Sequence, residues 1–201
     1  MVECVQRLAT FEPDTIFFCS GPAGAYGDDK AWSILVESLE TLGPVARASG
    51  SRLALEPMRH DVRDTWTIVS SLREALSLIE EVGRDDLGIV FDTWHMWDSP
   101  DVYEMIPEVV DRIYGVQIAD YRQPTRGPRD RLIAGDGVAD IPGLLRMLRE
   151  SGYDGWYDME VFSDDGRFGY AYEDSLWALG PTRFAERQVE GFRECWAKSG
   201  G

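Results

Sequence analysis

The chain has 201 residues, of which 44% are hydrophobic and 28% are charged, and its formal net charge is −16. This length and apolar content predict a single globular domain that spans residues 1–201. The acidic excess repels phosphate backbones, so nucleic acid is not expected as a partner, whereas divalent cations are favoured. No apolar run approaches the ~20 residues that cross a bilayer, so a membrane is not expected as a partner either.

Three cysteines, Cys4, Cys19 and Cys195, are far apart and odd in number. Their spacing matches neither a disulfide framework nor a zinc motif, which suits a reducing, cytoplasmic compartment. The first residues, MVECVQRLATFEPD, have neither the basic start nor the apolar core of a signal peptide.

Five short β-branched or aromatic runs are predicted to be strands, over residues 15–19, 52–56, 87–92, 113–119 and 156–162. Helical patterns follow them. The first helix begins at Asp28 or Asp29 and is bent or ended by Pro44. The second runs from Thr65 or Thr67 to a cap at Gly83. The others cover residues 99–109, 140–152 and 182–197. This alternation predicts parallel βαβ units. Residues 1–13 show weak patterning, and residues 120–137 are predicted to be a polar loop.

Side chains alternate between two faces along a strand, and four of the predicted strands share one pattern. One face carries large apolar residues suited to packing under helices. The other carries small residues and one polar group near the end of the strand, namely Glu56, Asp92, Gln117 or Glu160. In a parallel sheet these groups converge at the carboxyl end, where the active sites of such folds lie.

Four oxygen donors with three negative charges are typical of a site for a hard divalent cation, Mn²⁺ or Mg²⁺, with Co²⁺ as a further candidate. Without a cation, three crowded carboxylates would raise one another's pKa. Each residue also has a structural interpretation: Asp92 as a turn residue, Gln117 as a hydrogen-bonded filler, and Glu56 as a solvated loop residue. The recurrence in four strands favours the metal site.

Two further polar or aromatic positions follow Asp92 closely. His95 lies three residues beyond it, and this placement favours a substrate contact over a structural histidine. Trp94 and Trp97 either line a pocket or cover the mouth of the fold, and the pocket is favoured.

The motifs LALEP, GIVFDTWH, YGVQIAD, GDGVAD and GYDGWYDMEVFS, in this order, resemble those of the sugar isomerases and epimerases among xylose-isomerase-like TIM barrels. The resemblance covers about residues 15–162. It implies an α/β fold of the TIM (β/α)8 type and a substrate contact at His95. It also implies one divalent metal held by Glu56, Asp92, Gln117 and Glu160. Many members have histidine as the third metal ligand. Gln117 at this position resembles the pattern of the hydroxypyruvate-isomerase-like branch.

An arginine is common in this family in the loop after the third metal ligand. Arg122, Arg126, Arg129 and Arg131 are the candidates, and Arg122 is taken as the substrate-binding residue together with Trp94. The family's barrels have eight strands, whereas five are predicted here. The barrel is therefore expected to be N-terminally truncated to about five βα units. A start site placed too late, completion by a partner, and an inactive remnant all stay open as explanations.

The resemblance implies a metal-dependent isomerase or epimerase of a sugar or small α-hydroxycarbonyl compound. Glu56 and Glu160 would move a proton by way of an enediolate. A dehydratase of a sugar-like acid and a non-catalytic barrel remnant are the alternatives. An endonuclease of the same superfamily is disfavoured, because the chain has only two histidines and is strongly acidic. The expected partner is a small sugar-like molecule, and a homo-oligomer is a further expectation.

Overall fold

The computed structural model describes all 201 residues and contains a five-stranded parallel sheet beside a two-stranded antiparallel pair. The sheet has the order β1–β2–β3–β4–β7, with β1 (Thr15–Phe18), β2 (Arg52–Leu55), β3 (Leu87–Asp92), β4 (Ile113–Ile118) and β7 (Tyr157–Met159). The short pair joins β5 (Asp120–Tyr121) to β6 (Arg131–Leu132).

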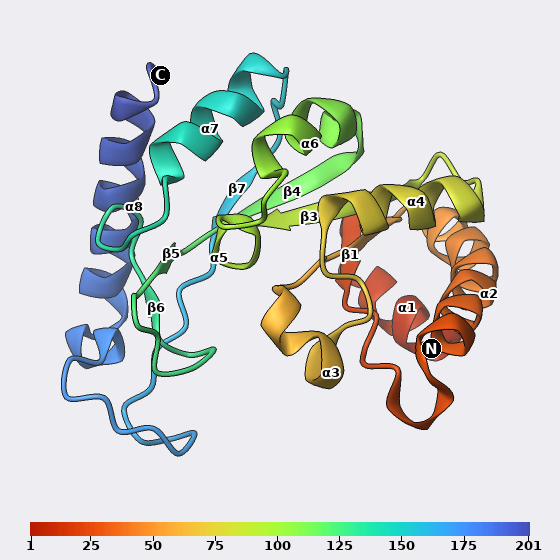
Figure 1. Cartoon of the computed structure of the whole chain (residues 1–201), viewed down its shortest axis with the longest axis horizontal. Helices are drawn as coiled ribbons and strands as arrows, with labels where there is room; N and C mark the ends of the chain where they lie inside the picture. The colour runs from red at the N-terminus through yellow and green to blue at the C-terminus, as the bar shows by residue number, and fades with distance from the viewer.

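Five helices form an arc around the outside of the sheet, and the strands lie within it (Figure 1). They are α2 (Asp28–Ala48), α4 (Leu72–Val82), α6 (Val102–Val109), α7 (Ile141–Glu150) and α8 (Pro181–Lys198). The shorter helices are α1 (Val2–Ala9), α3 (Arg63–Trp66) and α5 (Thr93–Met96). Parallel strands with outer helices confirm the predicted fold class, a half-barrel of the TIM type with five βα units.

The core lies between the outer face of the sheet and the arc of helices. Leu55, Phe91 and Ile118 are buried there, as alternation along the strands requires. The inner face carries small residues. A Cβ atom at Gly115 would lie 2.9 Å from the ring of Phe17, so the missing side chain gives that aromatic ring its space.

Several element boundaries differ from those that the sequence pattern predicts. The second helix was predicted to begin at Thr65 or Thr67, but α4 begins at Leu72. Thr67 has an extended backbone, and its Oγ1 accepts a hydrogen bond from the Val69 amide at 2.9 Å. Ser71 then caps α4 by accepting the Glu74 amide. Ile68 and Val69, which lie between Thr67 and Ser71, are buried but are not part of a helix.

Pro44 does not end α2, which continues to Ala48. A proline removes only its own amide donor, and the packing of Leu42 and Ala46 in the core holds the last turn in place. The predicted loop over residues 120–137 contains the β5–β6 pair, and the weakly patterned N-terminal segment contains α1.

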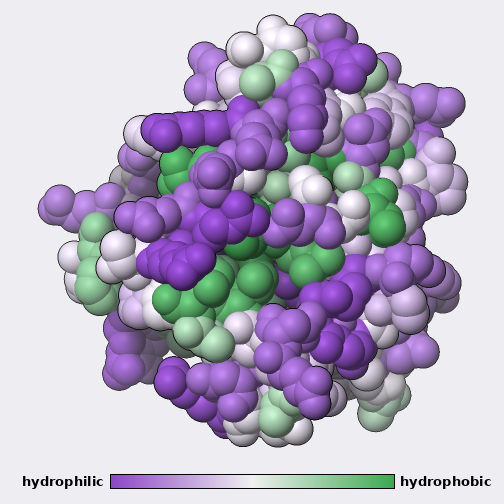
Figure 2. Space-filling view, turned by 90° about the vertical axis from the view of Figure 1, so that its left-hand side faces the viewer, coloured by the Kyte–Doolittle hydropathy of each residue, from purple (hydrophilic) through white to green (hydrophobic).

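None of the helices is long and apolar enough to cross a membrane. Figure 2 shows a mostly hydrophilic face with a central apolar patch bordered by hydrophilic residues. This face agrees with a chain in which 28% of the residues are charged.

Candidate active site

The ends of four parallel strands bring together the polar residues that the alternation singles out. Asp92 on β3 stands beside Gln117 on β4 in the sheet register. Glu56 directly follows β2 and donates its backbone amide to Phe18 on β1. Glu160 directly follows β7, and its backbone amide bonds to Ile118 on β4. These backbone bonds fix the side chains at the carboxyl edge of the sheet.

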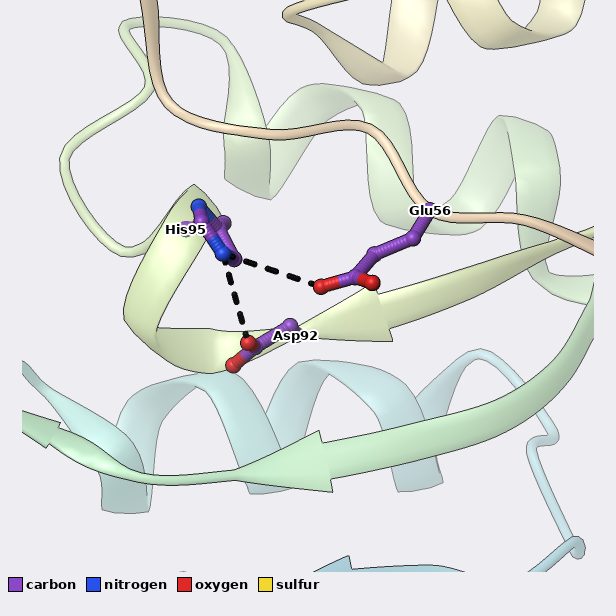
Figure 3. Close-up of side chains that lie close together, drawn as sticks. All are labelled: Glu56, Asp92 and His95. Atoms are coloured by element: carbon purple, nitrogen blue, oxygen red, sulfur yellow. Dashed lines mark ion pairs between the residues drawn. The ribbon is translucent and has the colours of Figure 1, made fainter. Parts of the chain in front are cut away.

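Side-chain contacts tie this group together. Gln117 Nε2 donates a hydrogen bond to Glu160 Oε1 at 3.0 Å. Glu56 Oε1 lies 3.7 Å from His95 Nε2, and Asp92 Oδ2 lies 3.8 Å from the same nitrogen. Figure 3 shows these three side chains turned toward one another, from the segment after β2, the end of β3 and α5. Asp92 is completely buried.

Arg131 on β6 places its guanidinium among these carboxylates. Its Nη1 donates to Asp92 Oδ2 at 2.7 Å and to Glu160 Oε2 at 2.8 Å. The guanidinium carbon lies 4.6 Å from the ring centroid of Trp94 and 4.9 Å from that of Phe162. Two rings and two carboxylates thus hold this cation in place, and its side chain is only 5% exposed.

The hydrogen bonding of His95 fixes which of its ring nitrogens carries the proton. The Arg59 amide donates to Nδ1 at 3.1 Å, and Arg131 Nη2 faces Nε2 at 3.3 Å. Because the Nδ1 contact is the shorter, we assign the proton of the neutral ring to Nε2. Burial lowers the pKa of His95 to about 4, so the ring is neutral at pH 7. His95 Nε2 is therefore a hydrogen-bond donor and offers no lone pair to a metal.

The two glutamates hold protons more tightly than glutamates in water do. Burial, and next the charge of Asp92, raise the pKa of Glu56 to about 7. The same two causes raise the pKa of Glu160, and Arg131 only partly offsets them. The site therefore lacks positive charge even with Arg131 in place.

The donor atoms fit a hard divalent cation. Gln117 Oε1 is buried and has no hydrogen-bond partner, which is a costly state that a cation would relieve. Glu56, Asp92 and His95 also offer atoms within 4.8 Å of one another. The oxygen atoms of Glu56, Asp92, Gln117 and Glu160 could hold such a cation, with His95 beside them.

A cavity of about 410 Å³ opens onto this group. Its polar lining consists of Cys19, Glu56, His95, Arg129, Arg131 and Glu160, and its apolar lining includes Met58, Val62, Trp66, Phe162 and Tyr170. A volume of this order suits a small molecule that is largely enclosed by protein. Acidic, basic and apolar groups therefore face one ligand-sized space.

The remaining residues predicted to bind substrate lie elsewhere. Trp94 is buried beneath Arg131 and does not line the cavity. Arg122 is turned away: its guanidinium pairs with Asp130 at 2.8 Å and with Asp174 at 2.9 Å. Of the four candidate arginines, only Arg129 and Arg131 reach the cavity.

The sequence reasoning did not single out Cys19, whose thiol donates to Glu56 Oε2 at 3.6 Å. Burial raises the pKa of this thiol to about 12, so it stays protonated and can act as a donor. Its position at the end of the first predicted strand was the available signal, because the other site residues also stand at strand ends.

Comparisons with known proteins agree with this fold. The model of the family described as "Xylose isomerase-like TIM barrel" matches residues 1–187. A 3-dehydroshikimate dehydratase of Pseudomonas putida is 26% identical over 93% of this chain and 29% of that protein. An inosose isomerase of Halalkalibacterium halodurans is 27% identical over 63% of this chain and 45% of that protein. The chain thus spans less than half the length of these two curated relatives.

Solved structures show the same architecture. A Sinorhizobium meliloti protein is 28% identical, with a TM-score of 0.82 over 96% of this chain and 69% of that chain. The IolI protein, in a structure with a zinc atom, is 17% identical, with a TM-score of 0.75 over 98% of this chain and 68% of that chain. The match of the family model to nearly the whole chain shows that it belongs to the xylose isomerase-like TIM barrel family.

Proposed function

We propose that the protein is a divalent-metal-dependent enzyme that isomerises or epimerises a sugar-like α-hydroxycarbonyl compound. One observation carries this proposal: Glu56 and Glu160, which follow different strands, line the same cavity beside buried oxygen atoms that could hold a metal. A glutamate side chain that faces a bound substrate can take up a proton and return it, which is the property that a general acid–base catalyst needs.

The residues divide the chemistry among them. Glu56 and Glu160 act as the acid–base pair, so that one removes the proton next to the substrate carbonyl and the other returns one to carbon. Glu56, Asp92, Gln117 and Glu160 would hold a divalent metal, for which we favour Mn²⁺ or Mg²⁺, and that metal would supply Lewis-acid stabilisation of negative charge on the substrate oxygens. Reprotonation at the neighbouring carbon gives isomerisation. Reprotonation on the opposite face of the same carbon gives epimerisation.

Two neighbouring N–H groups, on His95 and Arg131, can donate hydrogen bonds to a substrate oxygen. His95 Nε2 and Arg131 Nη2 lie 3.3 Å apart, and the tautomer of His95 makes both of them donors. They cannot bond to each other, so an acceptor oxygen placed beside them would receive two hydrogen bonds. We assign this position to a hydroxyl or carbonyl oxygen of the substrate.

Replacing Glu160 tests the acid–base assignment. We expect Glu160→Gln to lower turnover at least about 100-fold, because the amide keeps an oxygen ligand but cannot exchange a proton. The measurement is loss or exchange of the substrate α-proton in D₂O, followed by NMR on a panel of ketoses and inososes. Glu108→Gln removes one exposed carboxylate from α6 and should be fully active. Native-like exchange in Glu160→Gln would refute the role.

A second candidate reaction is dehydration, and the relatives favour it specifically. The relative aligned with 93% of the chain is a 3-dehydroshikimate dehydratase, and an inosose dehydratase of Klebsiella pneumoniae is 26% identical over 72% of it. Dehydration begins with the same proton removal and ends with loss of hydroxide from the next carbon, which the acid form of a glutamate can protonate. The same NMR assay separates the two reactions, because only dehydration yields an unsaturated or deoxygenated product.

A further inference from the structure

Arg129 is a cation at the cavity that the proposed proton transfer does not use. It lies between β5 and β6, half-buried, and shares the cavity lining with Glu56, Glu160 and Arg131. The guanidinium of Arg131 already forms ion pairs with Asp92 and Glu160. Arg129 forms no ion pair with any carboxylate.

The other two arginines of this segment are neutralised by two aspartates. Arg122 and Arg126 both pair with Asp130, whose side chain is almost fully buried, and both also pair with Asp174. These ion pairs fix the segment and leave Arg129 as its one unpaired guanidinium. The segment therefore presents a single free cation to the cavity.

The contacts of Arg129 hold it in place without satisfying its charge. Its guanidinium carbon lies 4.4 Å above the ring of Phe168, and Nη1 donates one long bond of 3.4 Å to the Phe168 carbonyl. Hydrogen bonds from the amides of Phe168, Tyr170 and Gly166 to its two oxygens lower the pKa of Asp164, and the charge of Arg129 adds to this effect without forming an ion pair. Most of the five N–H donors of Arg129 therefore have no protein acceptor.

The charge of the whole chain makes this arrangement informative. At a formal net charge of −16, the protein as a whole repels anions, so an anionic ligand needs local positive charge to bind. One guanidinium matches one carboxylate in a two-bond, planar contact, whereas a phosphate dianion calls for more positive charge than this rim supplies.

On these grounds, and resting on the proposed function, we infer that the substrate is a polyhydroxylated keto acid. Its carboxylate binds Arg129 at the rim of the cavity while its carbonyl faces Glu56 and Glu160. Arg129 then decides between acidic and neutral polyhydroxy ketones that have the same reacting atoms. It contacts the substrate but takes no part in moving protons.

The test compares ligands that differ only in charge. Shikimate and quinate carry a carboxylate and no ketone, so they cannot react, and their methyl esters are neutral. Binding of each to the Mg²⁺-supplemented 201-residue chain is measured by calorimetry, with inorganic phosphate as a further probe. We expect each acid to bind at least about tenfold more tightly than its ester and more tightly than phosphate. Added salt should weaken only the acids.

Variants assign this preference to one residue. Arg129→Met keeps an unbranched side chain over Phe168 but removes the charge, so the acids should lose about tenfold in affinity and the esters none. Arg129→Lys should keep part of the preference. Arg193→Met, which removes one exposed cation from α8, is the matched control and should behave as the native chain.

Several outcomes would overturn the inference. They are equal or undetectable binding of acid and ester to the native chain, a preference for phosphate, and an acid preference that survives in Arg129→Met. A melting temperature of Arg129→Met near that of the native chain shows that lost binding is not lost folding. Because these ligands cannot react, the result does not depend on turnover, and loss of the Glu160 role would leave it standing.

Discussion

Arg131 is the residue on which the charge balance of the site depends. Its guanidinium neutralises part of the charge of Asp92 and Glu160, and the rings of Trp94 and Phe162 hold it there. The sequence presents it as one of four candidate arginines, of which Arg122 was predicted to bind substrate. The short β5–β6 pair determines which arginine reaches the site. It places the side chain of Arg131 among the carboxylates, whereas Arg122 pairs with Asp130 and Asp174.

The raised pKa of Glu56 makes stability depend on pH in a definite direction. Its pKa rises from 4.5 to about 7 on folding, so the folded chain binds this proton more tightly than the unfolded chain does. The resulting stabilisation is complete below pH 4.5 and is lost as the pH rises through about 7. We expect the stability of the metal-free native chain relative to Glu56→Gln to fall by about 1–3 kcal/mol over this range.

Urea unfolding of both proteins in EDTA, at the two ends of the range, measures this difference. Glu56→Gln also removes a charge that helps to raise the pKa of Glu160, so the measured difference reports the two glutamates as a pair. A relative stability of the native chain that stays constant or increases with pH would show that Glu56 is not held in its acid form by burial.

At the scale of elements, the strands and most helix starts were predictable to within a few residues, whereas the start of α4 was not. The apolar runs at β2, β3 and β4 are bounded by charged residues, glycine or proline, and they form where alternation predicts. The start of α4 depends on competing local hydrogen bonds of Thr67 and Ser71, which hydrophobic periodicity does not weigh. The Ser-x-x-Glu signature from Ser71 to Glu74 was the overlooked sign of the true start.

Removing this cap should measurably destabilise the chain. Ser71→Ala deletes the acceptor of the Glu74 amide, and we expect a loss of about 1 kcal/mol in the free energy of unfolding. Ser77→Ala, in the exposed middle of the same helix, should be neutral or slightly stabilising because alanine favours helix. Equal effects of the two changes in denaturant unfolding would place the start of α4 elsewhere.

At the scale of the whole molecule, the half-barrel gathers the proposed chemistry at one edge. Glu56, Asp92, Gln117 and Glu160 each stand at the end of a different strand, and the parallel sheet brings those ends together. This convergence followed from alternation and resemblance alone. The tautomer of His95 and the orientations of the arginines could not be predicted, because they depend on contacts between segments far apart in the sequence.

A Mn²⁺ titration of the metal-free chain, followed by calorimetry and by electron paramagnetic resonance of the ion, tests the central claim most directly. We expect one Mn²⁺ per chain, an affinity at least about 100-fold lower in Asp92→Asn, and native affinity in Asp111→Asn, which alters an exposed aspartate. No stoichiometric binding to the native chain, or equal affinity in Asp92→Asn, would contradict the assignment of a metal site to the ends of these strands.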